Sequence, residues 1–183
     1  MKLLAVPFAF ALFAGLAVSA SAQVPGQDGD SEQHKWLRKF VGEWEVVSEA
    51  GAGEGQPPMK TTSTMKSTML GNLWIVNKTE TKAGGVTVNA IQTIGYDPKT
   101  KKYIGTWVDS MMNHLWHYKG TVDSTGMKIT LAAEGPSMSG EGTAKYRDAY
   151  EFTSDDTFTS TSSVLTADGK WVTFITGSGK RKK

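Results

Sequence analysis

The sequence lacks cysteine altogether: none of its 183 residues carries a thiol. A protein without cysteine can form neither a disulfide framework nor a metal site built from thiolates. It also has no cysteine that could carry a lipid after an export signal. The stability of the fold must therefore come from core packing and from backbone hydrogen bonds.

The sequence also lacks a strong excess of charge of either sign. Its 20 basic and 18 acidic residues give a formal net charge of +2. Four basic residues stand together at the end of the chain, Lys180, Arg181, Lys182 and Lys183, which is typical of a solvated tail. The rest of the chain offers no broad basic surface for phosphates, so we expect no nucleic-acid partner.

Long apolar runs are scarce, and the one that is present lies at residues 3–18. It precedes small residues up to Ala22, which is the pattern of a secretory signal peptide. Pro7 and Gly15 interrupt the run, and it is shorter than the roughly 20 residues that a membrane-spanning helix needs. We therefore predict a signal peptide at residues 1–22 and a periplasmic or secreted protein without a transmembrane segment after cleavage. An uncleaved membrane anchor is the alternative.

A short polar segment and a helix follow. Residues 23–30 are rich in Gly, Pro and Asp, so we expect a disordered leader there. In residues 31–41 apolar side chains recur at helical spacing behind Ser31, a residue that can cap a helix. This pattern predicts one short amphipathic helix, and Gly42 ends it.

Everything after Gly42 is typical of strands, with short runs of Thr, Val, Ile and aromatic residues between turn-forming breaks. The breaks lie at residues 51–58, 70–72, 83–85, 97–101, 110–113, 123–126, 135–142, 154–156 and 167–169. They delimit roughly ten strands, which favours an up-and-down barrel or a sandwich. We predict an all-β fold: a single antiparallel up-and-down β-barrel at residues 31–181, with one short N-terminal helix and a basic tail at 182–183.

Side-chain alternation predicts which faces point inward. In residues 59–69 the odd positions combine methionines, Met65 among them, with hydroxyl side chains, whereas the even positions include lysines. The odd row should face the interior, and its hydroxyls favour a cavity because buried hydroxyls need a partner such as water or a ligand. In residues 170–180 both rows are half apolar, so we expect this strand to be covered on both faces, with the helix as its outer cover.

The segment Gly42-Glu43-Trp44, between the helix and the first strand, resembles the Gly-x-Trp signature of lipocalin-like barrels. The resemblance implies that Trp44 closes the barrel floor. It also implies that a basic residue of the last strand, Arg181 or Lys180, lies across the indole ring in a cation–π contact.

A longer resemblance covers most of the chain. The segments that carry it include GYDP at 95–98, YIGTWVDSM at 103–111, LW at 115–116, YKG at 118–120 and DGKW at 168–171. They resemble the bacterial family called domain of unknown function 1579. This resemblance implies a lipocalin-like (calycin-type) barrel in an exported protein, and it implies no established activity.

Metal and haem sites find little support in the sequence. His114 and His117 are three residues apart, and such residues on a strand point to opposite faces, so they would not converge on one metal. A haem would need only one histidine, and His117 shares a face with Leu115 and Lys119. That face could be the outer surface or the cavity. We predict no metal and no cofactor.

Catalytic arrangements are weak as well. Asp109, Ser110 and His117 invite a triad, but adjacent strand residues point to opposite faces and no Gly-x-Ser-x-Gly elbow exposes a nucleophile. We expect Asp109 and Ser110 to bond to backbone amides of a turn instead. Carboxylates that could form a glycosidase pair are explained as solvated surface charges. These are Glu134, Glu141, Asp148 and Glu151.

The sequence therefore predicts an exported, non-enzymatic protein that holds a small hydrophobic or aromatic ligand in the barrel interior. Tyr103, Trp107 and Asp109 have the odd spacing of one inner face, and Met65 and Asn77 complete the predicted ligand-binding residues. One alternative is an interaction or structural module of the cell envelope with a filled core. A second alternative is a haem-binding or hydrolytic barrel.

Overall fold

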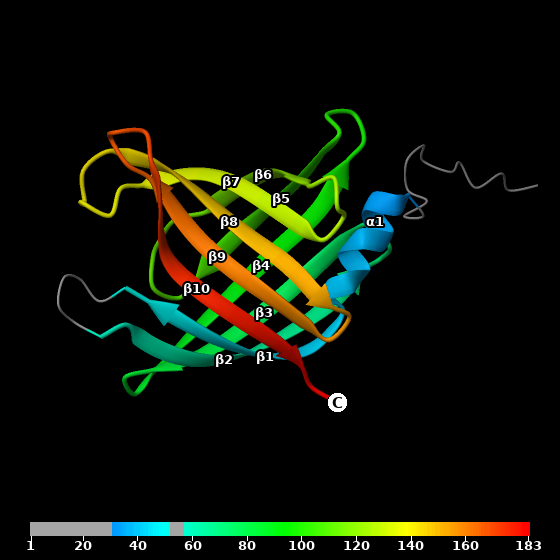
Figure 1. Cartoon of the computed structure of the whole chain (residues 1–183), viewed down its shortest axis with the longest axis horizontal. Coiled ribbons are helices and arrows are strands. Elements are labelled where there is room, and N and C mark those ends of the chain that lie inside the picture. The colour runs from blue at the N-terminus through cyan, green and yellow to red at the C-terminus, as the bar shows by residue number, and fades with distance from the viewer. Residues whose placement is uncertain (1–30, 52–56) are drawn as a thin grey trace, which may run out of the picture.

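The protein is a closed barrel of ten antiparallel strands. The structure, a computed structural model, describes residues 31–51 and 57–183. Each strand pairs with its neighbours in sequence, and β1 also pairs with β10, which closes the sheet (Figure 1). This arrangement confirms the predicted all-β up-and-down barrel. The predicted signal peptide and leader lie outside the described residues.

Strands and short connections alternate regularly along the chain. The strands are β1 (Gly42–Ala50), β2 (Met59–Leu70), β3 (Trp74–Ala83), β4 (Val86–Asp97), β5 (Lys102–Asp109), β6 (Trp116–Val122), β7 (Lys128–Pro136), β8 (Thr143–Ser154), β9 (Thr157–Leu165) and β10 (Trp171–Arg181). Because neighbouring strands are antiparallel, the connections after even-numbered strands lie at one end of the barrel and those after odd-numbered strands at the other.

The predicted helix is present and covers one end of the barrel (Figure 1). It consists of α1 (Glu32–Leu37) and a 3-10 turn, η1 (Arg38–Phe40), so its regular part is shorter than predicted. Ser31 caps α1, since its side chain accepts a hydrogen bond from the backbone N–H of His34 at 3.3 Å. Within the described residues, no helix is long and apolar enough to cross a membrane. We call the barrel end at the helix the closed end and the opposite end the open end.

The helix does not cover β10, and this prediction was wrong. It packs against the ends of β2, β3 and β4, while Trp171 and Val172 stay exposed. The two apolar rows have another cause: a β-bulge between Thr173 and Ile175 shifts the register of β10 against β9. A bulge inserts one residue, so the inward row changes parity along the strand. Apolar residues of both rows therefore point inward without a cover on the outer face.

Five interlocking aromatic residues, which we call the aromatic plug, fill the closed end. They are Trp36, Phe40, Trp44, Phe152 and Phe158, and all are buried. The ring centroids of Phe40 and Phe152 lie 5.0 Å apart, as do those of Trp44 and Phe158. Such contacts add to the gain from burying the rings. The indole N–H of Trp44 donates to the backbone oxygen of Phe40 at 2.7 Å, which fixes the helix end to the first strand.

Arg181 lies against the plug from the last strand. Its guanidinium carbon is 4.1 Å from the ring centroid of Trp44. The same group donates to the backbone oxygens of Lys39 and Asp155 at 3.1 and 2.7 Å and pairs with the Asp156 carboxylate at 3.0 Å. Arg181 therefore connects β10 to the helix, to β1 and to the β8–β9 turn. Of the two basic candidates, the structure places Arg181 and not Lys180 over the indole.

We expect Arg181→Ala to lower the free energy of unfolding by about 2–4 kcal/mol, because it removes a cation–π contact and leaves backbone oxygens without their donor. Urea unfolding followed by circular dichroism measures this change. Lys182→Ala is the matched control, since the Lys182 side chain makes only exposed contacts, an ion pair with Glu43 and a hydrogen bond to the Thr64 hydroxyl. Equal stability of the two variants would contradict the role of Arg181.

Candidate functional site

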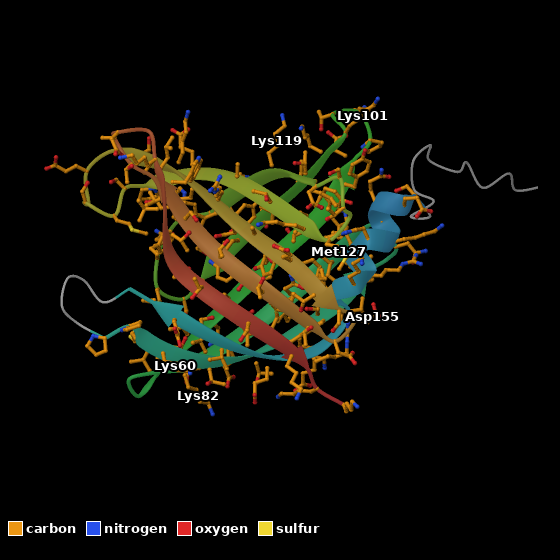
Figure 2. The ribbon with its side chains drawn as sticks, in the orientation of Figure 1. Lys60, Lys82, Lys101, Lys119, Met127 and Asp155 are labelled. Atoms are coloured by element: carbon orange, nitrogen blue, oxygen red, sulfur yellow. The ribbon has the colours of Figure 1, made fainter. Side chains whose placement is uncertain are left out.

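The barrel interior has two halves with different contents. The plug fills the closed end, whereas inward-facing residues of the open half are largely polar or only half-buried. Exposed lysines such as Lys60, Lys82 and Lys119 point away from the barrel wall (Figure 2). The chemistry of the open half is therefore set by uncharged side chains and by the few carboxyl groups that face inward.

A cross-barrel hydrogen-bonded layer separates the two halves. The side-chain amide of Asn77 on β3 donates to Oε1 of Gln92 on β4 at 3.0 Å. The hydroxyl of Tyr150 on β8 donates to the same oxygen at 3.3 Å. Three strands separate β4 from β8 around the barrel, so the bond between Tyr150 and Gln92 spans the interior. We call Asn77, Gln92 and Tyr150 the polar layer.

The polar layer and its surroundings hold buried polar atoms without a partner. These are Oδ1 of Asn77, Nε2 of Gln92 and Oγ of Ser67. The three residues are neighbours in register across β2, β3 and β4. Each unsatisfied buried group costs about 1–3 kcal/mol. Apolar residues at these positions would give a more stable core. The sequence here departs from the rule that buried polar groups form hydrogen bonds.

Asp148 is the second polar element of the interior. Its carboxylate accepts a short hydrogen bond from the hydroxyl of Tyr118 and another from Oγ of Ser162 at 2.6 Å. Burial raises the pKa of Asp148 above its usual value, and the two hydrogen bonds oppose that shift only in part. Burial and the nearby carboxylate also raise the pKa of Tyr118.

The interpretation of Asp148 as a solvated surface charge was wrong. Its neighbour Arg147 points outward and stacks on Trp171, with the guanidinium carbon 4.3 Å from the ring centroid. Adjacent residues of a strand face opposite sides, so Asp148 must point inward. Within residues 31–51 and 57–183, no salt bridge reaches this carboxylate. Asp148 is an interior acid without a paired base.

The space next to Asp148 is not completely filled. Asp148 and Tyr150 lie deep enough for burial to raise their pKa values, yet both keep part of their surface accessible. The wall beside them is made of small inward residues that are also only half-buried: Ser160, Ser162 and Gly177. The wall beside Asp148 is therefore less completely covered than the aromatic plug, whose residues are all buried.

Aromatic residues form the opposite wall toward the open end. Trp107 and Trp116 pair across β5 and β6, and both are half-buried. Trp116 packs edge-on against Tyr146, with ring centroids 5.1 Å apart. Gly135 leaves room for this ring, because a Cβ there would lie 2.4 Å from the indole of Trp116. A separate hollow of about 430 Å³ lies along β2 and β3, and most of its lining residues, such as Lys60 and Lys82, belong to the outward rows, so it is not part of the interior.

The structure does not bring the predicted ligand-binding residues together. Tyr103, Trp107 and Asp109 share the inner face of β5 as expected, but they span the length of the strand. Tyr103 belongs to the closed end, where it packs against Trp36 at 5.9 Å and lines a separate pocket of about 330 Å³. Met65 is buried in the core, opposite Trp44 in register.

Asp109 has a structural role at the open end. Its carboxylate accepts hydrogen bonds from the indole N–H of Trp107 at 3.0 Å and from the backbone N–H groups of Met111 and Met112 at 2.8 and 3.1 Å. Ser110 accepts from the backbone N–H of Asn89 at 3.0 Å. These contacts confirm that Asp109 bonds to backbone amides of the turn, whereas Ser110 bonds to an amide of strand β4 and not of a turn. Of the predicted residues, Asn77 lies in the polar layer and Trp107 lies on the open side of it.

Of the histidines, His117 lies outside the interior site, whereas His114 packs on its aromatic wall with Nε2 buried and without a hydrogen-bond partner among the described residues. His117 is exposed on β6, where it pairs in register with Thr106 on the outward row. His114 lies before β6, with its ring centroid 4.8 Å from that of Trp116. In the described part of the chain, no group of three or more His, Cys, Asp or Glu residues could hold a metal ion.

Several interior residues escaped the sequence analysis. Gln92 alternates with Ala90 and Ile94 on one face of β4, so an amide in an apolar row was the available signal. Asp148 likewise lies between Tyr146 and Tyr150 on the inward row of β8. Side-chain alternation could have revealed both positions, but the cross-barrel contacts could not be read from it.

Comparison with known proteins gives a family and a fold. The family described as "Protein of unknown function (DUF1579)" matches residues 30–181. The crystal structure of Rv2717c from M. tuberculosis is similar, with a TM-score of 0.62 and 12% identity over 84% of this chain and 99% of that chain. No curated protein matches the sequence.

Two further solved structures match less closely. The structure of EF1p2_mFAP2b bound to DFHBI has a TM-score of 0.41 and 11% identity over 82% of this chain and 99% of that chain. A redesigned β-barrel, b11L5F_LGL, has a TM-score of 0.36 and 12% identity, and the match covers 82% of this chain and 96% of that chain. At such identities the likenesses concern the fold alone.

The raised pKa of Asp148 predicts that the free energy of unfolding depends on pH. The folded state holds this proton more tightly than the unfolded chain, whose aspartates have a pKa of about 3.9. The free energy of unfolding should therefore fall as the pH rises from about 4 through the raised pKa. Asp148→Asn should lack this fall, so the stability of the wild type relative to the variant should be higher at pH 4 than at pH 7. Urea unfolding at both pH values tests this, and a difference that is independent of pH would contradict it.

Proposed function

The chain belongs to the protein family DUF1579, and from its barrel geometry we propose that it is an exported, non-enzymatic binding protein for a small amine with an apolar or aromatic body. The ligand lies in the open half of the interior, above the polar layer. The observation that carries the proposal is Asp148, an inward carboxylate that is not fully covered and that no salt bridge reaches within residues 31–51 and 57–183. Export is supported by the signal-like pattern of residues 1–22.

The amine follows from the electrostatics of the interior. Burying a carboxylate without a counter-ion is costly, and a ligand cation supplies the missing charge. Tyr118 and Ser162 already donate to this carboxylate, so they hold it in one orientation. Tyr146 and Tyr150 flank it on the same strand face. Aromatic faces attract organic cations, so the tyrosine rings and the carboxylate both favour the amine group of the ligand.

The apolar body of the ligand follows from the aromatic wall. Trp107 and Trp116 are large, half-buried and close to the open end. An aromatic or aliphatic group packed on them would remove apolar surface from water. Ligand pockets commonly combine such apolar walls with a few convergent polar groups.

The alternatives from the sequence receive less support. A haem in the interior would need an inward histidine, and His117 is exposed on the outer face. A hydrolase would need a free Asp109 and Ser110, but both bond to backbone amides at the open end. An envelope module that uses the basic tail would need free charges, and Lys182 pairs with Glu43 at 2.8 Å.

A matched pair of ligands tests the amine. We expect 1-naphthylmethylamine to bind and 1-naphthaleneacetic acid, which has the same ring and the opposite charge, to bind at least about tenfold more weakly. Asp148→Asn should lower the affinity for the amine by roughly tenfold and narrow the gap between the two ligands. Isothermal titration calorimetry at pH 8 measures both effects, because the Asp148 carboxyl is more fully ionised there than at neutral pH. Equal binding of the two ligands would remove the case for an amine.

A second pair of variants tests where the ligand lies. Trp116→Ala should weaken binding of 1-naphthylmethylamine by roughly tenfold, because the ligand loses an aromatic contact. Trp171→Ala is the matched control, since Trp171 stacks on Arg147 outside the barrel. If the two variants bind alike, the ligand does not lie in the interior.

A further inference from the structure

Among the described residues, large exposed apolar side chains lie on the outer wall (Ile91 and Val108), at the closed end and, most of them, at the open end. Every connection at this end carries or adjoins at least one of them, and we call this set the apolar rim. Its members are Met59 after β1, Val86 after β3, Met111, Met112 and Leu115 between β5 and β6, Met138 between β7 and β8, and Val172 after β9. Their exposed fractions run from 45% for Met112 to 76% for Met111.

The closed end differs. Among the described residues there, the large apolar side chains that are exposed are Val41 and Leu70. Single apolar residues on a surface are ordinary. Several of them around one end are not ordinary, because an accumulation of exposed apolar surface commonly marks an interaction site. The concentration at one end therefore needs an explanation that the fold alone does not supply.

The shape of the rim limits what can cover it. Its members lie on separate hairpins, and these hairpins are at the end of the barrel away from α1 (Figure 1). A rigid protein partner needs a continuous complementary surface. A fluid lipid interface adapts to separate apolar tips, since each can enter the boundary between headgroups and acyl chains on its own. The rim geometry favours lipid over a protein surface.

The charges beside the rim indicate the kind of lipid. Lys60 lies 3.6 Å from Glu49, and Lys170 lies 2.9 Å from Asp168. These pairs flank β1–β2 and β9–β10, where they cancel each other's charge. An anionic membrane attracts clusters of basic residues, whereas the other lysines near this end, Lys82 and Lys145, are interspersed with Glu80 and Glu141, so no basic cluster forms among the residues described. The match is with a zwitterionic headgroup layer.

We propose that the apolar rim docks onto the surface of a zwitterionic phospholipid bilayer, with the barrel opening facing the lipid. Docking itself needs only the rim. A second step rests on the proposed function. In this step an apolar amine passes between the bilayer and the interior site without crossing bulk water.

Vesicle flotation tests the docking. The chain should start at Gln23, because the apolar run at residues 3–18 would bind vesicles by itself. This chain retains residues 31–183, which hold every contact described above. With phosphatidylcholine vesicles, we expect the wild type to float, and Met111→Ser/Leu115→Ser/Met138→Ser to partition roughly tenfold less. Binding should persist in 0.5 M NaCl (about 3–5 Å of screening length) because it does not depend on charge.

Val41→Ser/Leu70→Ser is the matched control, since it removes exposed apolar side chains at the closed end, and it should float like the wild type. The proposal is overturned if the wild type does not float, or if the rim variant floats equally. It is also overturned if only phosphatidylserine vesicles bind and salt releases them. A change from dimer to monomer in the rim variant, seen by light scattering, would assign the rim to a second copy of the chain.

Amine binding to the interior site can be measured separately in the same variants. The rim variant should bind 1-naphthylmethylamine like the wild type, because none of its three positions lies beside Asp148. Loss of flotation with retained amine binding supports docking. Flotation without any amine binding would leave docking standing and remove the proposed ligand.

Discussion

Closure of the sheet between β1 and β10 is the constraint on which the rest of the structure depends. The seam runs from Trp44 opposite Arg181 to Ala50 opposite Ile175. Because the closed sheet has no edge strand, every inward row faces a single interior. Arg181 lies at the end of this seam and contacts Trp44, the helix end and the β8–β9 turn. One side chain thereby couples the seam to the aromatic plug.

The plug and the polar layer have opposite energetic effects. The plug buries aromatic rings that contact one another directly and cover the closed end. The polar layer leaves amide atoms of Asn77 and Gln92 without partners, and the neighbouring Ser67 hydroxyl also lacks one. Within the described residues, no salt bridge reaches Asp148. A fold can tolerate such groups when a well-packed region offsets their cost. The separation of the two along the barrel axis suits a protein whose open half must remain available to a ligand.

The fold could be predicted from the sequence largely because turns and alternation are local. The odd row of residues 59–69 points inward as expected, with Ser63, Met65 and Ser67 buried. The helix and the contacts of Asp109 with turn amides were also predicted correctly. The error at residues 170–180 arose from the bulge beside Thr173. One inserted residue moves the inward row from even to odd positions, so both rows of the sequence look half apolar. A bulge leaves no clear signature in alternation.

The candidate site was harder to predict because alternation gives the face of a residue and not its depth. Tyr103 and Asp109 share a face, yet they lie at opposite ends of β5. Asp148 stands next to Arg147 in the sequence, and their pairing on a surface was a natural reading that the strand geometry excludes. The bond from Tyr150 to Gln92 joins strands far apart in the chain. Such a contact depends on how the barrel closes, which local patterns do not encode.

The confinement of the plug to one end has an evolutionary consequence. Since the aromatic plug lies beside the helix, the hairpins at the open end contribute little to the stability of the fold. Insertions and substitutions there can accumulate without unfolding the scaffold. Paralogues could in this way diversify what they recognise while keeping one framework, and the same separation makes the barrel a suitable starting point for the laboratory selection of new binders.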